Sequence, residues 1–83
     1  MNRSEADQRM AETKKELSDV NERLRTADTQ LSQFELQAAD NSAKQDAVEG
    51  TRAEVAGLQT KLEALLHRQH LLEARMRELG WVN

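Results

Sequence analysis

Apolar residues recur at intervals of three and four along two stretches of the chain, which the polar segment Asp40-Asn41-Ser42 separates. Sustained heptads with apolar positions a and d are typical of coiled-coil helices. In the first stretch these positions hold Ala6, Met10, Thr13, Leu17, Val20, Leu24, Ala27, Leu31, Phe34 and Ala38. In the second they hold Val48, Thr51, Val55, Leu58, Leu62, Leu65, Gln69, Leu72, Met76 and Leu79.

The two heptad frames are mirror images about Asn41, which predicts that the chain folds back on itself there. When the chain folds back at Asn41, Leu24 of the first helix lies level with Leu58 of the second. The same register sets polar Thr13 opposite polar Gln69, and such a layer is a device that fixes the register of a coiled coil. We therefore predict an all-α, antiparallel two-helix coiled-coil hairpin that forms one domain. Within residues 1–83 its parts are a helix over about 4–39, a turn at 40–42 and a helix over about 43–79.

Polar residues near the expected helix ends predict how each helix is capped. Ser4 is a candidate N-cap of the first helix, because its hydroxyl can accept a hydrogen bond from a free backbone N–H. Asn41 tolerates the left-handed conformation in which many helices end. Ser42 followed by Gln45 fits a capping box, so that a new helix can begin there.

Two other arrangements remain compatible with the pattern. A turn at Gly50-Thr51 has a capping box of its own, Thr51 with Glu54, and leaves the first helix overhanging. Alternatively, one continuous helix forms a parallel oligomer, with the change of frame as a three-residue insertion that overwinds the coil. The Asn41-centred hairpin is the arrangement we expect.

Charged residues beside the seam do not choose between these arrangements. In the Asn41 register Asp28 attracts Arg52 and Glu16 attracts Arg68. Complementary charge at such flanking positions favours a given pairing. Three like-charged pairs oppose these two, namely Arg9 with Arg75, Arg23 with Lys61, and Asp7 with Glu73.

Composition agrees with long helices and limits the possible functions. The 83 residues, 33% of them charged, include no proline or tyrosine, one phenylalanine and one tryptophan. This is poor material for a globular core and good material for amphipathic helices. The chain has no cysteine for a disulfide and no stretch approaching the roughly 18 apolar residues of a membrane span. The net charge of −3 argues against nucleic-acid binding. We expect a soluble cytoplasmic protein with no cofactor and no membrane partner.

The second helix has small residues that the seam does not use. Two helices alone cannot enclose a core, and small side chains in a row allow another helix to approach closely. We expect this surface to form a homodimer contact that completes a four-helix bundle. Alternatively, alanine is present as a helix former and the glycines mark local bending. The predicted contact residues are Gly50, Gly57, Ala64 and Leu71, in a line that begins at Ala43, together with Leu66, which adds to it.

Two further residues are candidate contacts for a partner protein. Leu36 lies opposite the seam near the turn, where it is expected to be exposed. Trp81 follows Gly80, a natural helix-ending residue, and is expected to pack back over the last helical turn. Trp81 is therefore either a cap on the open end of the hairpin or an aromatic anchor for a partner.

Residues that could carry chemistry are few. Glu63, His67 and His70 share one face of the second helix, where a two-fold dimer could double them into a metal site. The histidine spacing is not that of a zinc protease, and exposed histidines with no metal are the simpler interpretation.

These patterns predict a non-enzymatic interaction protein that homodimerises and binds an unidentified protein as an adaptor, regulator or inhibitor. One alternative is a structural or chaperone-like coiled coil that holds a helical client or spaces an assembly. The other is a metal- or pH-responsive helical switch built on the two histidines. No catalytic motif is recognisable in the sequence.

Overall fold

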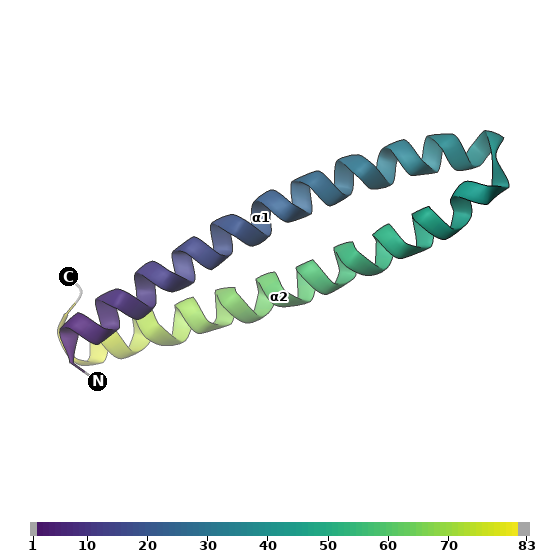
Figure 1. Ribbon diagram of the computed structural model, residues 1–83. Helices are drawn as coiled ribbons and strands as arrows, with labels where there is room; N and C mark the ends of the chain where they lie inside the picture. Colours follow the sequence, from purple (N-terminus) through teal and green to yellow (C-terminus); the bar gives the residue numbers. More distant parts are fainter. Residues whose placement is uncertain (1, 82–83) are drawn as a thin grey trace.

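The computed structural model describes residues 2–81 as two long helices joined by a tight turn (Figure 1). Helix α1 runs over Arg3–Asp40, a 3₁₀ turn η1 over Ser42–Lys44, and helix α2 over Gln45–Glu78. The two helices lie side by side in opposite directions, so that the start of α1 and the end of α2 lie at one end of a molecule measuring 59 × 18 × 14 Å. This confirms the predicted all-α antiparallel hairpin.

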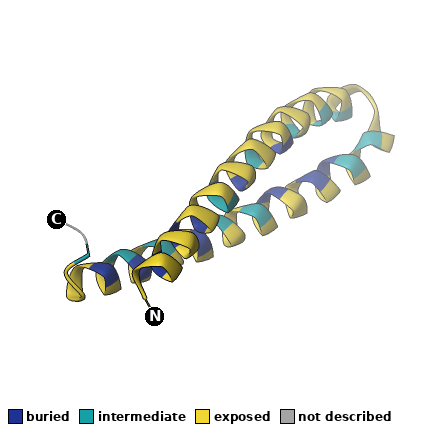
Figure 2. Ribbon diagram, turned by 60° about the vertical axis from the view of Figure 1, so that its left-hand side comes forward, coloured by how far each residue is buried: buried dark blue, intermediate teal, exposed yellow. Residues whose placement is uncertain are grey.

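The predicted seam is the side on which the two helices meet. On α1 all ten predicted a and d residues are buried or half-buried, and on α2 nine of the ten are. The exception is Leu79 at the last position, which is 38% exposed. Figure 2 shows the buried positions on the inner sides of the two helices. Heptad spacing therefore identified the core, because it depends only on which side chains share a helix face.

The turn lies at Asn41, as predicted, and the two rival arrangements are wrong. Thr51 is buried inside α2, and its hydroxyl donates to the carbonyl oxygen of Ala47 at 2.8 Å, so no turn forms at Gly50-Thr51. A continuous helix is wrong because η1 and Asn41 interrupt it. The helix bounds differ slightly from those expected: α1 ends at Asp40, and α2 begins at Gln45 after η1.

The capping of the turn differs from the prediction. Asn41 has φ −145° and ψ 103°, an extended conformation rather than a left-handed one. Its side-chain Oδ1 accepts a hydrogen bond from the backbone N–H of Ala43 at 3.0 Å, and its carbonyl oxygen accepts one from Lys44 at 3.0 Å. Asn41 therefore starts η1 itself, in the role that had been assigned to Ser42 with Gln45.

The first N-cap also differs. Asn2, not Ser4, caps α1: its Oδ1 accepts a hydrogen bond from the backbone N–H of Glu5 at 2.8 Å. The Asn2 amide in turn donates to the Glu5 carboxylate at 3.4 Å. Ser4 lies inside the helix because the extended backbone required of an N-cap occurs at Asn2, where φ is −92° and ψ 170°.

The C-terminal end of α2 closes in the predicted way. Gly80 has φ 74°, and its N–H donates to the carbonyl oxygen of Arg77 at 3.0 Å, while Trp81 donates to that of Met76 at 2.9 Å. These two bonds form a Schellman motif, in which glycine adopts the left-handed conformation without a steric penalty. Trp81 packs against a cluster at the open end of the hairpin, which consists of Ala6, Met10, Leu72 and Met76.

Buried polar groups in the hairpin are satisfied locally. Thr13 is 1% exposed, and its hydroxyl donates to the carbonyl oxygen of Arg9 at 2.8 Å. Gln69 is half-buried, and no hydrogen bond joins it to Thr13 in the part of the chain that is described. Their role as a register layer stays a prediction. Within residues 2–81, neither helix has a segment long and apolar enough to cross a bilayer.

Candidate interaction surfaces

Two inter-helix ion pairs mark the two broad faces of the hairpin. On one face Arg68 Nη1 donates to Glu16 Oε2 at 3.2 Å. On the other, Arg52 Nη2 lies 3.8 Å from Glu35 Oε1. In the heptad frames the first pair occupies positions g and the second positions e, which flank a seam on opposite sides. The faces are called the charged face, marked by Glu16–Arg68, and the leucine face, marked by Glu35–Arg52.

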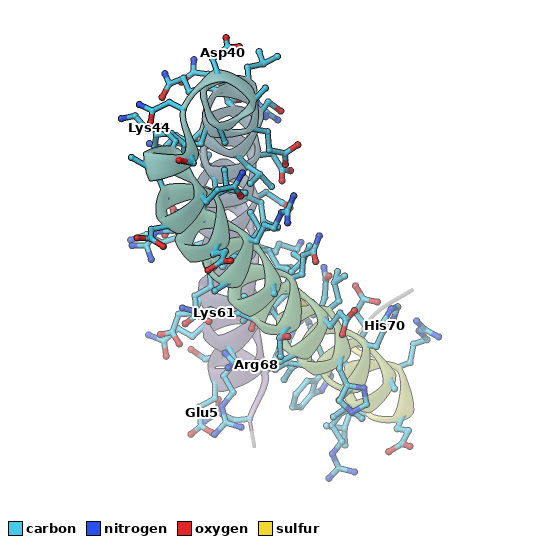
Figure 3. The ribbon with its side chains drawn as sticks, turned by 90° about the vertical axis from the view of Figure 1, so that its right-hand side faces the viewer. Glu5, Asp40, Lys44, Lys61, Arg68 and His70 are labelled. Carbon is cyan, nitrogen blue, oxygen red and sulfur yellow. The ribbon has the colours of Figure 1, made fainter. Side chains whose placement is uncertain are left out.

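The charged face covers its part of the seam closely. Beneath it lie the small d residues Thr13, Val20 and Ala27, which are 1%, 3% and 2% exposed. Long charged side chains line the depressions above them. The one above Val20 has a volume of about 90 Å³, and those above Ala27 and Thr13 are larger, at about 300 and 280 Å³. Figure 3 shows Lys61 and Arg68 on the same side of the helix pair. This side of the seam is screened by the stems of charged residues.

The leucine face leaves its part of the seam partly open. The a residues Leu17, Leu24 and Leu31 of α1 are half-buried, and so is Leu62 of α2. Leu66, at an e position of α2, is 41% exposed. Several of the residues between them are uncharged, namely Ser18, Asn21, Ser32 and Gln59, while Arg25 and Asp28 are charged, and all six are exposed. Sequence reasoning missed this difference between the faces, although the neutral flanking residues were a signal for it.

One expected ion pair forms and the other is replaced. Glu16–Arg68 is confirmed, but Arg52 pairs with Glu35 instead of Asp28. Helical side chains lean toward the N-terminus of their own helix, so those of α2 lean toward the turn and those of α1 away from it. Arg52 therefore converges on Glu35, one heptad nearer the turn, and diverges from Asp28.

The small-residue line of α2 lies on the outside of the hairpin. Ala43, Gly50, Gly57, Ala64 and Leu71 are all exposed, and Leu71 is 58% exposed. A Cβ atom added to Gly50 or Gly57 would meet nothing within 4 Å. Packing within one chain therefore gives no reason for these glycines. Helical spacing separates this line from Leu66, which belongs to the leucine face.

The two ends of the hairpin differ as candidate contacts. Leu36, near the turn, is 75% exposed, the highest value among the exposed large apolar residues of the described chain. Trp81 is half-buried against the open-end cluster. Most of the anchoring surface of Trp81 is thus engaged within the fold, whereas that of Leu36 is free.

Comparisons with protein-family models, curated proteins and solved structures found no match to this chain. The surfaces themselves therefore carry the functional argument.

The candidate metal ligands do not form a site within one chain. Glu63, His67 and His70 are all exposed on α2, and no group of three His, Cys, Asp or Glu residues among those described could hold a metal ion. Figure 3 shows His70 on the side of the pair away from Lys61 and Arg68. In the described chain every buried side-chain nitrogen or oxygen also has a hydrogen-bond partner, so none requires a ligand.

Proposed function

We propose that this protein is a non-enzymatic interaction protein, which pairs its hairpins into a four-helix bundle and binds another protein as an adaptor, regulator or inhibitor. The observation that carries the proposal is the exposure of four leucines in a chain that has few large apolar residues. Leu36, Leu66, Leu71 and Leu79 are 75%, 41%, 58% and 38% exposed.

The architecture supports association because a hairpin is only one layer of helices. Stable helical domains bury an apolar stripe against a second layer, and isolated helix pairs of this size are marginal without one. Leu66, on the leucine face, and Leu71, on the outside of α2, lie off the seam that the hairpin already uses. Pairing of two hairpins supplies the missing layer, and four-helix bundles of antiparallel neighbours are built in this way.

The exposed leucine at the turn supports a second kind of contact. Leu36 lies in the last turns of α1, which ends at Asp40, and the turn between α1 and α2 is at the far end of the molecule from the start of α1 (Figure 1). A bundle of paired hairpins leaves this end accessible. A solitary exposed leucine beside polar residues suits a helix-in-groove or end-on contact with a different protein.

Sedimentation equilibrium between about 1 and 100 µM tests homodimerisation directly. We expect a mass twice that of one chain, falling toward one chain at the lowest concentration, with helical circular dichroism throughout. A single-chain mass at every concentration would overturn homodimerisation. Low helicity that rises only on adding a client would favour the alternative role as a holder of helical clients.

Binding of another protein is tested by affinity capture from the native cell, with wild-type and Leu36→Glu baits side by side. We expect a protein that is retained by wild-type bait and lost from the variant, while both baits keep the same melting temperature. Retention by both baits would move the contact away from Leu36, and no specific capture by either would count against an adaptor role.

A further inference from the structure

The leucine face is built like the inner side of a helical bundle. Helices that face a bundle core carry apolar residues at a and d and also at e or g, whereas a two-helix seam needs a and d alone. Helix α2 has this additional residue in Leu66, which is 41% exposed. On α1, the small exposed residues Ser18 and Ser32 lie beside the leucine row, before and after Leu24, among charged residues.

The leucine row of α1 matches its own reverse. Leu17 and Leu31 stand at equal distances on either side of Leu24, and so nearly do Ser18 and Ser32. In an isologous contact each residue meets the residue at the mirrored position of a second copy. A two-fold axis beside Leu24 therefore lays Leu24 on its counterpart and Leu17 on Leu31 of the second copy.

Under the same two-fold axis, two pairs of charges beside this row are complementary, and one contact is between like charges, because Arg25 lies beside Arg25 of the second copy. Lys14 and Glu35 are nearly equidistant from Leu24 on opposite sides, so each copy sets its Lys14 near Glu35 of the other. Arg25, beside the axis, lies within reach of Asp28 of the second copy when both side chains lean toward their own N-termini. All four residues are exposed in the single hairpin, and Glu35 also lies 3.8 Å from Arg52 of its own chain, so a second copy would add Lys14 to that pair.

We propose that a second copy of this chain packs on the leucine face, with α1 antiparallel to α1 about a two-fold axis beside Leu24. This inference rests on the homodimer of the proposed function and specifies its interface. The face is 59 Å long and 18 Å wide, which accommodates the roughly 800 Å² per partner of a standard interface. A second copy covers the leucine row and also pairs Lys14 with Glu35, because both arrangements are centred close to Leu24.

Two leucines of α2 provide a matched test of the face. Leu66 lies on the leucine face and Leu71 on the outside of the same helix, and both are largely off the seam, at 41% and 58% exposed. Leu66→Glu is expected to raise the dimer dissociation constant at least tenfold in sedimentation equilibrium. Leu71→Glu is expected to leave it within about threefold of wild type. Both variants are expected to keep the helical circular dichroism of wild type at high concentration.

The outcomes separate this inference from the proposed function. If Leu71→Glu dissociates the dimer and Leu66→Glu does not, the small-residue line is the interface and the leucine face is not. If neither variant weakens the dimer, the inference is again overturned while homodimerisation stands. A wild-type protein that is monomeric at every concentration overturns the proposed homodimer itself.

Single cysteines test the two-fold axis, since the chain has no cysteine of its own. Arg25 and Thr26 are adjacent and both exposed, but helical spacing places Arg25 beside the axis and Thr26 toward the charged face. A disulfide requires Cα atoms within about 7 Å. Arg25→Cys is expected to form a covalent dimer under mild oxidation at least tenfold faster than Thr26→Cys. Equal rates would place the axis elsewhere.

Discussion

The two broad faces of the hairpin share one seam and bury it unequally. On the charged face, Thr13, Val20 and Ala27 are at most 3% exposed. On the leucine face, Leu17 and Leu24 are only half-buried. Along α1, the small d residues are covered and the larger a leucines project further. Residue size therefore affects burial more than the face does, because on α2 the a residues Val48 and Val55 are buried at 3% and 9% although they lie on the leucine-face side.

The largest expected effect is a loss of stability, and it is tested by truncating one leucine on each side of the seam. Leu65 is 2% exposed on the charged-face side of α2, and Leu62, nearly one turn away, is half-buried on the leucine-face side. Leu65→Ala is expected to lower the free energy of unfolding by about 3 kcal/mol, and Leu62→Ala by about 1.5 kcal/mol, because less surface leaves water at Leu62. Urea unfolding at a concentration that favours single hairpins measures both.

Equal losses at the two positions would contradict the difference between the faces as the single hairpin shows it. A loss at Leu62→Ala that grows with protein concentration, while that of Leu65→Ala does not, would instead show that association covers the leucine face.

The sequence predicts some of these features well because they depend on spacing alone. The seam from Ala6 to Met76 and the turn at Asn41 follow from which residues share a helix face. The caps were harder, since Asn2 and Ser4 both offer an oxygen and only the backbone conformation selects one. The salt-bridge partner of Arg52 depends on the direction in which its side chain leans, and this direction was omitted from the sequence-based pairing.

The inequality of the two faces along α1 has a signal in the sequence. Small residues occupy d of α1 at Thr13 and Ala27, while leucines occupy a. Uncharged Asn21 and Gln59 stand beside the leucines, where the opposite side carries charged residues. The outer glycines were predicted as contacts, and nothing in the single hairpin explains them beyond their open surroundings.

The next largest effect on stability is expected at the open end of the hairpin, which is common to both faces. Gly80 has φ 74°, a conformation that costs an ordinary L residue roughly 1–2 kcal/mol. Gly80→Ala is expected to lower the free energy of unfolding by about 1 kcal/mol and to loosen Trp81 from the Ala6–Met76 cluster. A red shift of tryptophan fluorescence before global unfolding would report this. Unchanged stability and fluorescence would mean that the Schellman motif contributes little.

The outside of α2 belongs to neither face, and a substitution there is expected to stabilise the protein rather than destabilise it. At Gly57 an added Cβ meets nothing within 4 Å. Gly57→Ala is therefore expected to raise the free energy of unfolding by about 1 kcal/mol through helix propensity alone. Gly50→Ala is the parallel case and is expected to behave alike. Thermal melts at low and high protein concentration measure the change. A variant that is stabilised when dilute and destabilised when concentrated would place an interface on the small-residue line.

The smallest effects compare the ion pairs that mark the two faces. Exposed pairs contribute about 0.2–1 kcal/mol and are screened by salt. Glu16 makes a 3.2 Å hydrogen-bonded pair with Arg68, whereas Glu35 and Arg52 are 3.8 Å apart, so Glu16→Gln is expected to cost about 0.5 kcal/mol and Glu35→Gln less. Urea unfolding in low and high salt, at low protein concentration, tests this order.

The same pair of variants also reports on association. In a dimer across the leucine face, Glu35 gains Lys14 of the second copy, whereas Glu16 on the opposite face gains nothing. The cost of Glu35→Gln is therefore expected to rise with protein concentration and to overtake that of Glu16→Gln. The stability cost of Lys14→Glu is expected to rise with protein concentration in the same way. In the charge-swapped double variant Lys14→Glu/Glu35→Lys, most of this concentration-dependent cost is expected to disappear. If Glu16→Gln costs more stability than Glu35→Gln at every protein concentration, a second copy does not pack on the leucine face.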